Sequence, residues 1–192
     1  MTKCAGVSSR RAPATFRPLA RVAAARNKWY RKYLFLDRGC TVRMTQHSDY
    51  ALRMLMYLAL RPAGLSTVGE IADAYGLSRN HLLKVALRLR GLGVVATVRG
   101  RTGGIRLARP AQEINIGALL RATEEDFALV ECMHPGGGAC ALTPACRLRT
   151  VLGEALSAYL EVLGRYSLAD IAGNREALVP LLGLEMPAFA EG

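Results

Sequence analysis

The sequence predicts a mainly α-helical fold, a winged helix-turn-helix with a small β-hairpin wing and a long dimerisation helix. Three observations support this class. Apolar residues recur at helical spacing through most of the chain after residue 44, two short helical patterns are joined by a glycine turn, and two β-branched runs flank a glycine-rich tip. With 51% hydrophobic residues, the chain can bury a real core. Its apolar runs stay well below the roughly 18 residues that span a bilayer, so we expect no membrane partner.

The first three helices are predicted from their apolar stripes and their end signals. The pattern from Thr45 to Arg61 is helical and is ended by Pro62-Ala63-Gly64. Thr67 can cap a second helix, and Gly76 can close it in the left-handed conformation. Ser78 can then cap a third helix. The expected buried stripe of this third helix consists of Leu82, Val85, Ala86 and Leu89.

Polar residues crowd the first turns of the third helix. They are Arg79, Asn80, His81 and Lys84, followed by Arg88. A short helix, a tight glycine turn and a second helix that begins with polar residues are typical of a pair that enters the DNA major groove. The sequence therefore predicts that the third helix is a recognition helix.

The wing is predicted from two runs, 94–98 and 105–107, around the tip 99–104. Arg99 and Arg101 lie in this tip and can reach a minor groove, where a narrow A·T-rich groove strengthens the negative potential. Between Asp73 and Glu113 the sequence has no acidic residue. The basic residues of this strip are Arg79, Lys84, Arg88, Arg90, Arg99, Arg101, Arg106 and Arg109. This local strip, more than the net charge of +11, indicates nucleic-acid binding.

The positive charge is concentrated in residues 1–43, which hold 11 Lys and Arg residues and one acidic residue, Asp37. From Met44 onward, 15 basic residues face 14 acidic ones. The first segment resembles a disordered basic arm or an organellar transit peptide, or it reflects a start codon placed too far upstream. We favour the last interpretation, with Val42 or Met44 as the initiator, and assign no role to Cys4 and Cys40.

Cys132, Cys140 and Cys146 lie in a stretch rich in glycine and proline. Thiolates are soft ligands that suit iron-sulfur clusters and zinc, and the slack between these cysteines suits a group larger than one ion. Three donors are one short of a four-ligand site, and His134 would complete a Cys3His zinc site. The cysteines could also be ordinary buried apolar residues. Five cysteines, an odd number, and no signal peptide disfavour a disulfide framework and favour the reducing cytoplasm.

A long apolar stripe runs for about five turns from Leu148 to Leu163. Such a stripe needs a partner, either the same helix of a second copy or the chain's own domain, and we favour the homodimer. Short terminal helices should follow. Paired carboxylates or other acid–base groups do not accompany the cysteines, so we expect no enzyme.

Four motifs together resemble the bacterial winged-helix iron-sulfur regulators, over about residues 42–184. They are Thr45-x3-Asp49-Tyr50-Ala51-Leu52-Arg53, Ser78-Arg79-Asn80-His81-Leu82-x-Lys84, Val98-Arg99-Gly100-x2-Gly103-Gly104-Ile105-Arg106-Leu107, and Thr143-Pro144-Ala145-Cys146-Arg147-Leu148. The run Ser-Arg-Asn-His and the lack of a histidine shortly after Cys146 resemble the nitric-oxide-sensing NsrR branch. The IscR branch, which takes a His ligand there, is the second interpretation, together with an iron- or redox-responsive regulator.

The resemblance implies a homodimeric cytoplasmic repressor of a palindromic double-stranded DNA operator, released by nitric oxide. Its cofactor would be an iron-sulfur cluster, 4Fe-4S in preference to 2Fe-2S. Three thiolates, from Cys132, Cys140 and Cys146, would hold it with Asp49 of the other subunit; His134 and Glu131 are competing donors. The DNA-binding residues would be Ser78, Arg79, Asn80, His81, Lys84, Arg99 and Arg101. The expected segments are a basic extension (1–43), a winged helix-turn-helix (44–125), a cluster-binding loop (126–147), dimerisation and terminal helices (148–184) and a tail (185–192).

Overall fold

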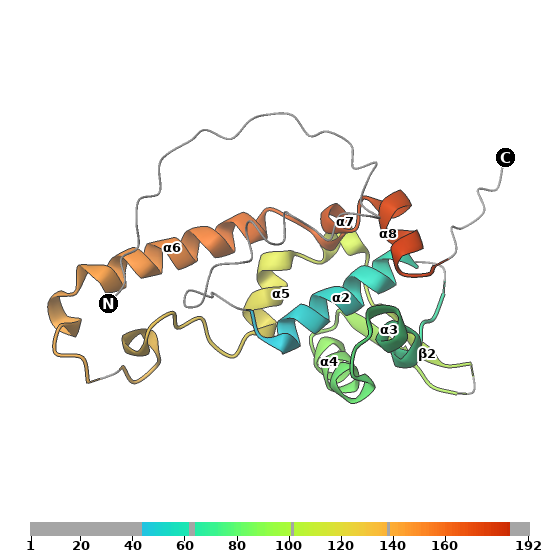
Figure 1. Ribbon diagram of the computed structural model, residues 1–192, viewed down its shortest axis with the longest axis horizontal. Helices are drawn as coiled ribbons and strands as arrows, with labels where there is room; N and C mark the ends of the chain where they lie inside the picture. The colour runs from blue at the N-terminus through green and yellow to red at the C-terminus, as the bar shows by residue number, and fades with distance from the viewer. Residues whose placement is uncertain (1–43, 62–63, 101, 138, 185–192) are drawn as a thin grey trace. The chain divides into compact units, whose positions relative to one another are not determined.

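The computed structural model describes residues 44–61, 64–100, 102–137 and 139–184 (Figure 1). The predicted extension 1–43 and tail 185–192 lie outside these residues. The described helices are α2 (Gln46–Leu60), α3 (Val68–Tyr75), α4 (Arg79–Gly91), α5 (Ile116–Thr123), α6 (Arg147–Gly164), α7 (Leu168–Ile171) and α8 (Arg175–Leu181). The strands are β1 (Val95–Val98) and β2 (Gly104–Leu107), and short 3-10 turns are η1 (Ala111–Glu113), η2 (Glu131–Met133) and η3 (Thr143–Ala145). The mainly helical fold with a β-hairpin is confirmed.

Helix α2 is the centre of the packed part and contacts α4, α5, α7, α8 and β2 (Figure 1). It begins after Thr45, whose hydroxyl accepts a hydrogen bond from the Ser48 amide. Its fully buried face includes Ala51, Met54 and Leu55. The last turn of α2 carries no basic residue of its own; instead Arg175 of α8 donates to the carbonyls of Ala59 and Leu60 at 2.9 and 2.6 Å. The Arg175 guanidinium, from far along the chain, thus satisfies two carbonyl groups at the C-terminal end of α2, where the helix dipole favours a positive charge.

The α3–turn–α4 pair forms as predicted. Thr67 and Glu70 form a reciprocal capping box at the start of α3, and Gly76 closes it with φ 64° in the left-handed region. All four residues predicted for the inner stripe of α4 are buried, and Leu82, Val85 and Leu89 have no exposed surface. The helix-turn-helix is therefore fixed by local caps and by one apolar stripe.

The wing is an antiparallel hairpin in which Val95 pairs with Leu107 and Val98 pairs with Gly104. Ser66 extends it, because the Ser66 and Ile105 backbones exchange hydrogen bonds at 2.9 and 2.8 Å. Gly104 is needed here, since a Cβ at this position would lie 2.9 Å from the Ser66 carbonyl oxygen. The connection before α3 thus anchors the wing to the helix-turn-helix.

Helix α6 follows the cysteine segment (residues 124–146) and, among the described residues, packs mainly through its C-terminal end. A Cβ at Gly117 of α5 would lie 2.7 Å from the backbone nitrogen of Gly164, so the two helices touch backbone to backbone. Leu160 is the one buried residue of α6. The five turns predicted for this helix are confirmed. Among the residues described, the helices are too short or too polar to cross a membrane.

Candidate functional site

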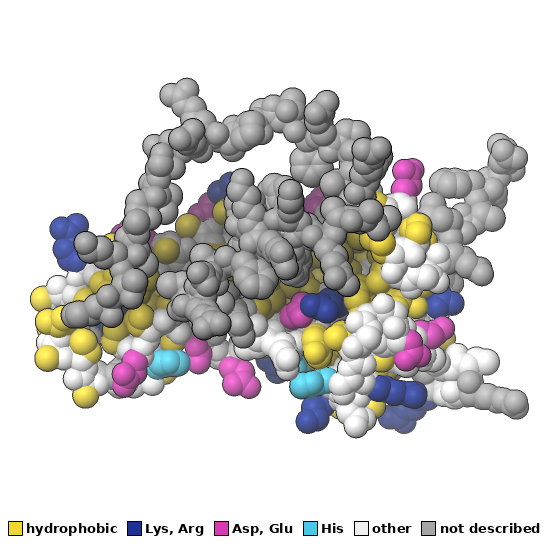
Figure 2. All heavy atoms as spheres, viewed as in Figure 1, with side chains coloured by type: hydrophobic (Ala, Val, Ile, Leu, Met, Phe, Trp, Pro, Cys, Tyr) yellow, Lys and Arg dark blue, Asp and Glu magenta, His cyan; other side chains and the backbone are white. Residues whose placement is uncertain are grey.

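The first turns of α4 present polar side chains to solvent. Ser78, Arg79, Asn80 and Lys84 are all exposed. Ser78 stands at the N-cap position, but within the described residues its hydroxyl makes no capping hydrogen bond, which differs from the cap predicted from the sequence. An unused hydroxyl and exposed amide and ammonium groups can contact phosphates or base edges. Figure 2 shows Lys and Arg side chains (dark blue) gathered over α3 and α4.

Two other α4 residues are held by contacts inside the protein. The His81 ring packs edge-to-face on Tyr50 of α2, with ring centroids 5.6 Å apart. Arg88, which the sequence placed in the basic strip, donates to the Ala122 carbonyl at 2.7 Å. Arg88 therefore links α4 to the end of α5, a role that its sequence pattern did not indicate.

The structure describes one of the two arginines that the sequence predicts as DNA contacts in the wing. Arg99 is exposed just after β1, where a groove-reading side chain would be expected. Arg101, the other predicted wing contact, lies outside the described residues. Both stay predictions as DNA contacts.

The three cysteines follow α5 along the chain but are not gathered by the described part of one subunit. Cys132 lies in η2, Cys140 is exposed before η3, and Cys146 is the residue that precedes α6. The described residues contain no group of three or more Cys, His, Asp or Glu side chains close enough to share a metal ion. Gly136 and Gly137 have φ of 102° and 55°, so only glycine suits the turn between the first two cysteines. The Nδ1 atom of His134 lies 3.5 Å from Oδ2 of Asp126.

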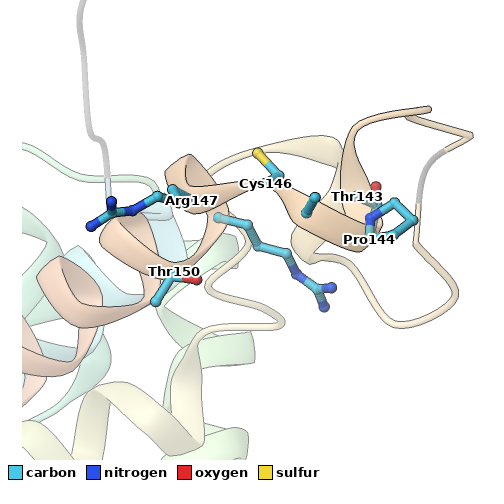
Figure 3. A pocket seen from close by; sticks show the side chains of 7 residues that line it. Thr143, Pro144, Cys146, Arg147 and Thr150 are labelled. Carbon is cyan, nitrogen blue, oxygen red and sulfur yellow. The ribbon is translucent and has the colours of Figure 1, made fainter.

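The segment before α6 forms an open hollow of about 430 Å³ (Figure 3). Figure 3 shows Cys146 between the turn that carries Thr143 and Pro144 and the first turn of α6. Arg147 and Arg149 also line the hollow. The buried Thr143 hydroxyl has no hydrogen-bond partner among the described residues. The soft Cys146 thiol, two cations and an unsatisfied hydroxyl suit a thiolate-bound group that carries negative charge.

Asp49, the predicted fourth ligand, lies in the first turn of α2 and is paired within its own subunit. The Arg53 Nη2 atom lies 2.7 Å from Asp49 Oδ2, and Arg53 Nε donates to Asp49 Oδ1 at 2.9 Å. The Asp49 side chain remains 40% exposed. The Arg53 guanidinium lies 5.9 Å from the centre of the Tyr50 ring. Since Tyr50 contacts His81, a continuous series of contacts joins Asp49 to the recognition helix.

A second junction lies where α5 ends and the cysteine segment begins. The buried Ser48 hydroxyl donates to Thr123 at 2.8 Å, and the Thr45 amide donates to Glu124 at 3.0 Å. Together with the bond from Arg88 to Ala122, these contacts connect the end of α5 to both α2 and α4. Sequence reasoning missed Ser48 and Thr123. A serine among the apolar positions of a helix is the one signal that could have indicated Ser48.

The fold and the exposed polar turn of α4 define a winged-helix transcriptional regulator. The model of the Rrf2 family, described as iron-dependent transcriptional regulators, matches residues 44–174. The chain therefore belongs to the Rrf2 family, and within it is a transcriptional regulator of the NsrR type. The family consists of regulators and not enzymes, as the sequence predicted.

The relatives support this assignment over most of their length. The chain is 47% identical to HTH-type transcriptional regulator NsrR of Bacillus subtilis over 145 residues, 75% of this chain and 99% of that protein. It is 49% identical to NsrR of Shouchella clausii over 142 residues, 73% and 95% of the two chains. Among solved structures, T. potens IscR has a TM-score of 0.56 at 25% identity and covers 71% of this chain and 90% of its own.

Proposed function

We propose that this chain is a homodimeric repressor whose affinity for a palindromic operator is set by an iron-sulfur cluster that responds to nitric oxide. The observation that carries the proposal is the junction at the end of α5. There, the segment with all three thiols begins directly beside hydrogen bonds to the recognition helix and to α2. A conformational change in the cysteine segment would be transmitted to the recognition helix α4 through these hydrogen bonds.

The DNA contacts would come from Ser78, Arg79, Asn80 and Lys84, with Arg99 and Arg101 of the wing. His81 would act at the edge of this surface, because its ring already packs on Tyr50. Arg79 suits guanine, and an Arg–guanine pair is worth about 1–3 kcal/mol of discrimination. Lys84 suits a phosphate, which contributes affinity without sequence preference.

The dimer would form through α6. Its first four turns expose Leu148, Val151 and Tyr159 by 61%, 54% and 42%, a surface that a lone subunit leaves in water. Figure 2 shows hydrophobic side chains (yellow) gathered at the end of the molecule where α6 begins. A second α6 would cover this face, and two-fold symmetry would present two recognition helices to half-sites about 34–36 Å apart.

The cluster, 4Fe-4S in preference to 2Fe-2S, would be held by Cys132, Cys140 and Cys146, with Asp49 supplied by the other subunit. When bound, it supplies iron that nitric oxide can attack, most readily where a hard carboxylate is a poor match for a soft metal. Arg147, Arg149 and the Thr143 hydroxyl would offset its negative charge. Asp49 would have to leave Arg53 to serve as a ligand, which would free Arg53 and alter the contacts that lead to His81.

The test measures operator affinity in three states of the full chain. Protein purified without oxygen is analysed for iron and acid-labile sulfide, and gel shifts are run with the loaded protein, with protein exposed to nitric oxide and with cluster-free protein. We expect tight binding only in the loaded state. A nearly complete switch needs about 5.5 kcal/mol of differential affinity, or about 10⁴-fold.

Cys140→Ala should abolish iron binding, whereas the matched control Cys40→Ala should leave it unchanged. Equal operator affinity in all three states would refute the proposal. Zinc in place of iron would support instead a structural Cys3His site with His134. An undiminished response to iron level without a response to nitric oxide would favour the IscR-like alternative.

A further inference from the structure

Two leucines are exposed on the face of α4 that points away from the core. Leu83 and Leu87 are 46% and 60% exposed, although their helix also carries four buried apolar residues. Leaving large apolar side chains in water is unfavourable, by about 25 cal/mol for each Å² that could be buried. Nothing in the helical pattern requires leucine at these two positions, because the inner stripe is already complete.

The positions of these leucines coincide with the polar residues proposed to read DNA. Because α-helical residues three and four apart lie side by side, Leu83 lies beside Asn80 and next to Leu87, and Leu87 lies beside Lys84. All of these side chains are exposed. The outer face of α4 is therefore half polar and half apolar.

We infer that Leu83 and Leu87 read thymine 5-methyl groups in the major groove of the operator. The inference rests on the proposed function, in which α4 enters that groove. The only large apolar feature that base pairs display in the major groove is the thymine methyl group, and amide side chains such as Asn80 pair with the adenine edge. The cations beside the leucines, Arg79 and Lys84, match the charge of DNA and argue against an apolar protein surface as the occupant.

The chemistry of the two halves of this face is complementary. Asn80 can accept and donate hydrogen bonds at adenine, while a leucine next to it in the same groove can cover the methyl group of a thymine in the same or an adjacent pair. An apolar contact of this kind distinguishes thymine from cytosine, which carries hydrogen at the same ring position. Leu83 and Leu87 thus act as specificity-determining residues, and their removal changes which sequences are bound more than how strongly phosphates are held.

The test removes single methyl groups from DNA. The loaded full chain selects its preferred site from random duplexes, and each thymine of that site is then replaced by deoxyuridine, which lacks only the 5-methyl group. We expect one or two thymines in each half-site at which the replacement weakens binding about fourfold, the effect of one buried methyl group. In Leu87→Ala or Leu83→Ala, affinity for the thymine site falls and the same replacement has no further effect.

Leu181→Ala is the matched control, because Leu181 is 73% exposed on α8, away from α4. It should retain the full sensitivity to deoxyuridine. Thermal melting and sedimentation establish that each variant is folded and has the native oligomeric state.

The outcomes separate this inference from the proposed function. If Asn80→Ala and Lys84→Ala weaken binding but no deoxyuridine replacement does, the inference is overturned and the recognition helix stands. A change of oligomeric state in Leu83→Ala or Leu87→Ala with a flat deoxyuridine scan would show that the leucines form a protein contact, which also overturns it. If none of the four α4 variants changes operator binding, the proposed function fails as well.

Discussion

The winged helix and the cysteine segment are stabilised in different ways. In the winged helix, residues from α2, α3, α4 and the wing share one buried core, and Met54, Leu55, Ile71 and Leu82 have no exposed surface. From Glu124 to Cys146 the described chain forms only 3-10 helices, hydrogen-bonded turns and bends, and the cysteines are half-buried or exposed. One region folds on its own apolar contacts, and the other lacks comparable contacts within a single subunit.

This difference has a functional consequence. A region with few buried contacts has low local stability and can rearrange at little cost, whereas a packed core moves as a unit. A signal received in the cysteine segment would therefore be passed on through the few bonds at the end of α5.

The largest difference should appear when a buried residue of the winged helix is compared with an exposed cysteine of the cysteine segment. Leu82→Ala removes a side chain with no exposed surface and should cost about 2–5 kcal/mol in cluster-free protein. Cys140→Ala, at an exposed position, should cost less than about 0.5 kcal/mol. Urea unfolding followed by circular dichroism measures both. A cost for Cys140→Ala near that of Leu82→Ala would show that the cysteine segment is part of the core.

The two helices that flank the cysteine segment, α5 and α6, touch at Gly117, and this contact can be broken there. A methyl group there would lie 2.7–3.0 Å from the backbone of α6 at Gly164 and Leu160, so Gly117→Ala must push the helices apart, at a cost of about 1–3 kcal/mol. Gly153→Ala is the matched control, because it lies in α6 with open space around it and should stabilise the helix by about 0.5–1 kcal/mol. Thermal melting of the two variants measures the difference. Equal melting temperatures would mean that α6 does not depend on this contact.

The fold was predictable because its signals are local. The inner stripe of α4, the cap at Thr67 and the left-handed Gly76 depend on residues within one or two turns, and all were confirmed. The predicted cap at Ser78 makes no side-chain capping bond among the described residues. The bonds from Arg175 to the end of α2 and from Ser48 to Thr123 join residues 75 or more positions apart. Such pairs leave no periodic trace in one sequence, so they could not be predicted.

The candidate site was predictable only as a set of residue types. Thiols, a glycine-rich turn and a polar first turn of α4 indicated metal binding and DNA recognition, but not how the side chains are arranged. His81 and Arg88 illustrate the limit, since their positions indicated DNA and their side chains contact Tyr50 and Ala122. The ligand role of the cysteines and of Asp49 stays a prediction, because the described residues of one subunit do not bring these side chains together.

Arg88 offers a way to separate coupling from DNA binding. Arg88→Ala removes the hydrogen bond from α4 to the end of α5. The difference in the free energy of operator binding between loaded and cluster-free protein should therefore shrink by about 0.5–2 kcal/mol. Arg90→Ala is the control, because it removes the same charge from an exposed position on the same helix. It should weaken both states alike through lost phosphate attraction. If Arg88→Ala also weakens both states alike, Arg88 contributes charge and not coupling.

The smallest expected effect is on the stability of the winged helix alone, and it arises from the capping box at the start of α3. The backbone amide of Thr67 donates to Glu70 and, with smaller contributions from the Thr67 hydroxyl and Arg61, lowers the pKa of Glu70. Because the folded-state pKa is depressed, this stabilisation is present above the ordinary range of a glutamate, near pH 4.5, and is lost as the pH falls through the lowered value.

Glu70→Ala should therefore cost about 0.5 kcal/mol at neutral pH, the low end for capping groups because the side chain is 43% exposed, and less in acid. Glu70→Gln keeps a side-chain oxygen that can accept from Thr67 but does not titrate, so its stability relative to Glu70→Ala should not change with pH. Urea unfolding of the three proteins at neutral and acidic pH measures this. A constant difference between wild type and Glu70→Ala across that range would place the origin of the effect in packing of the side chain rather than in its charge.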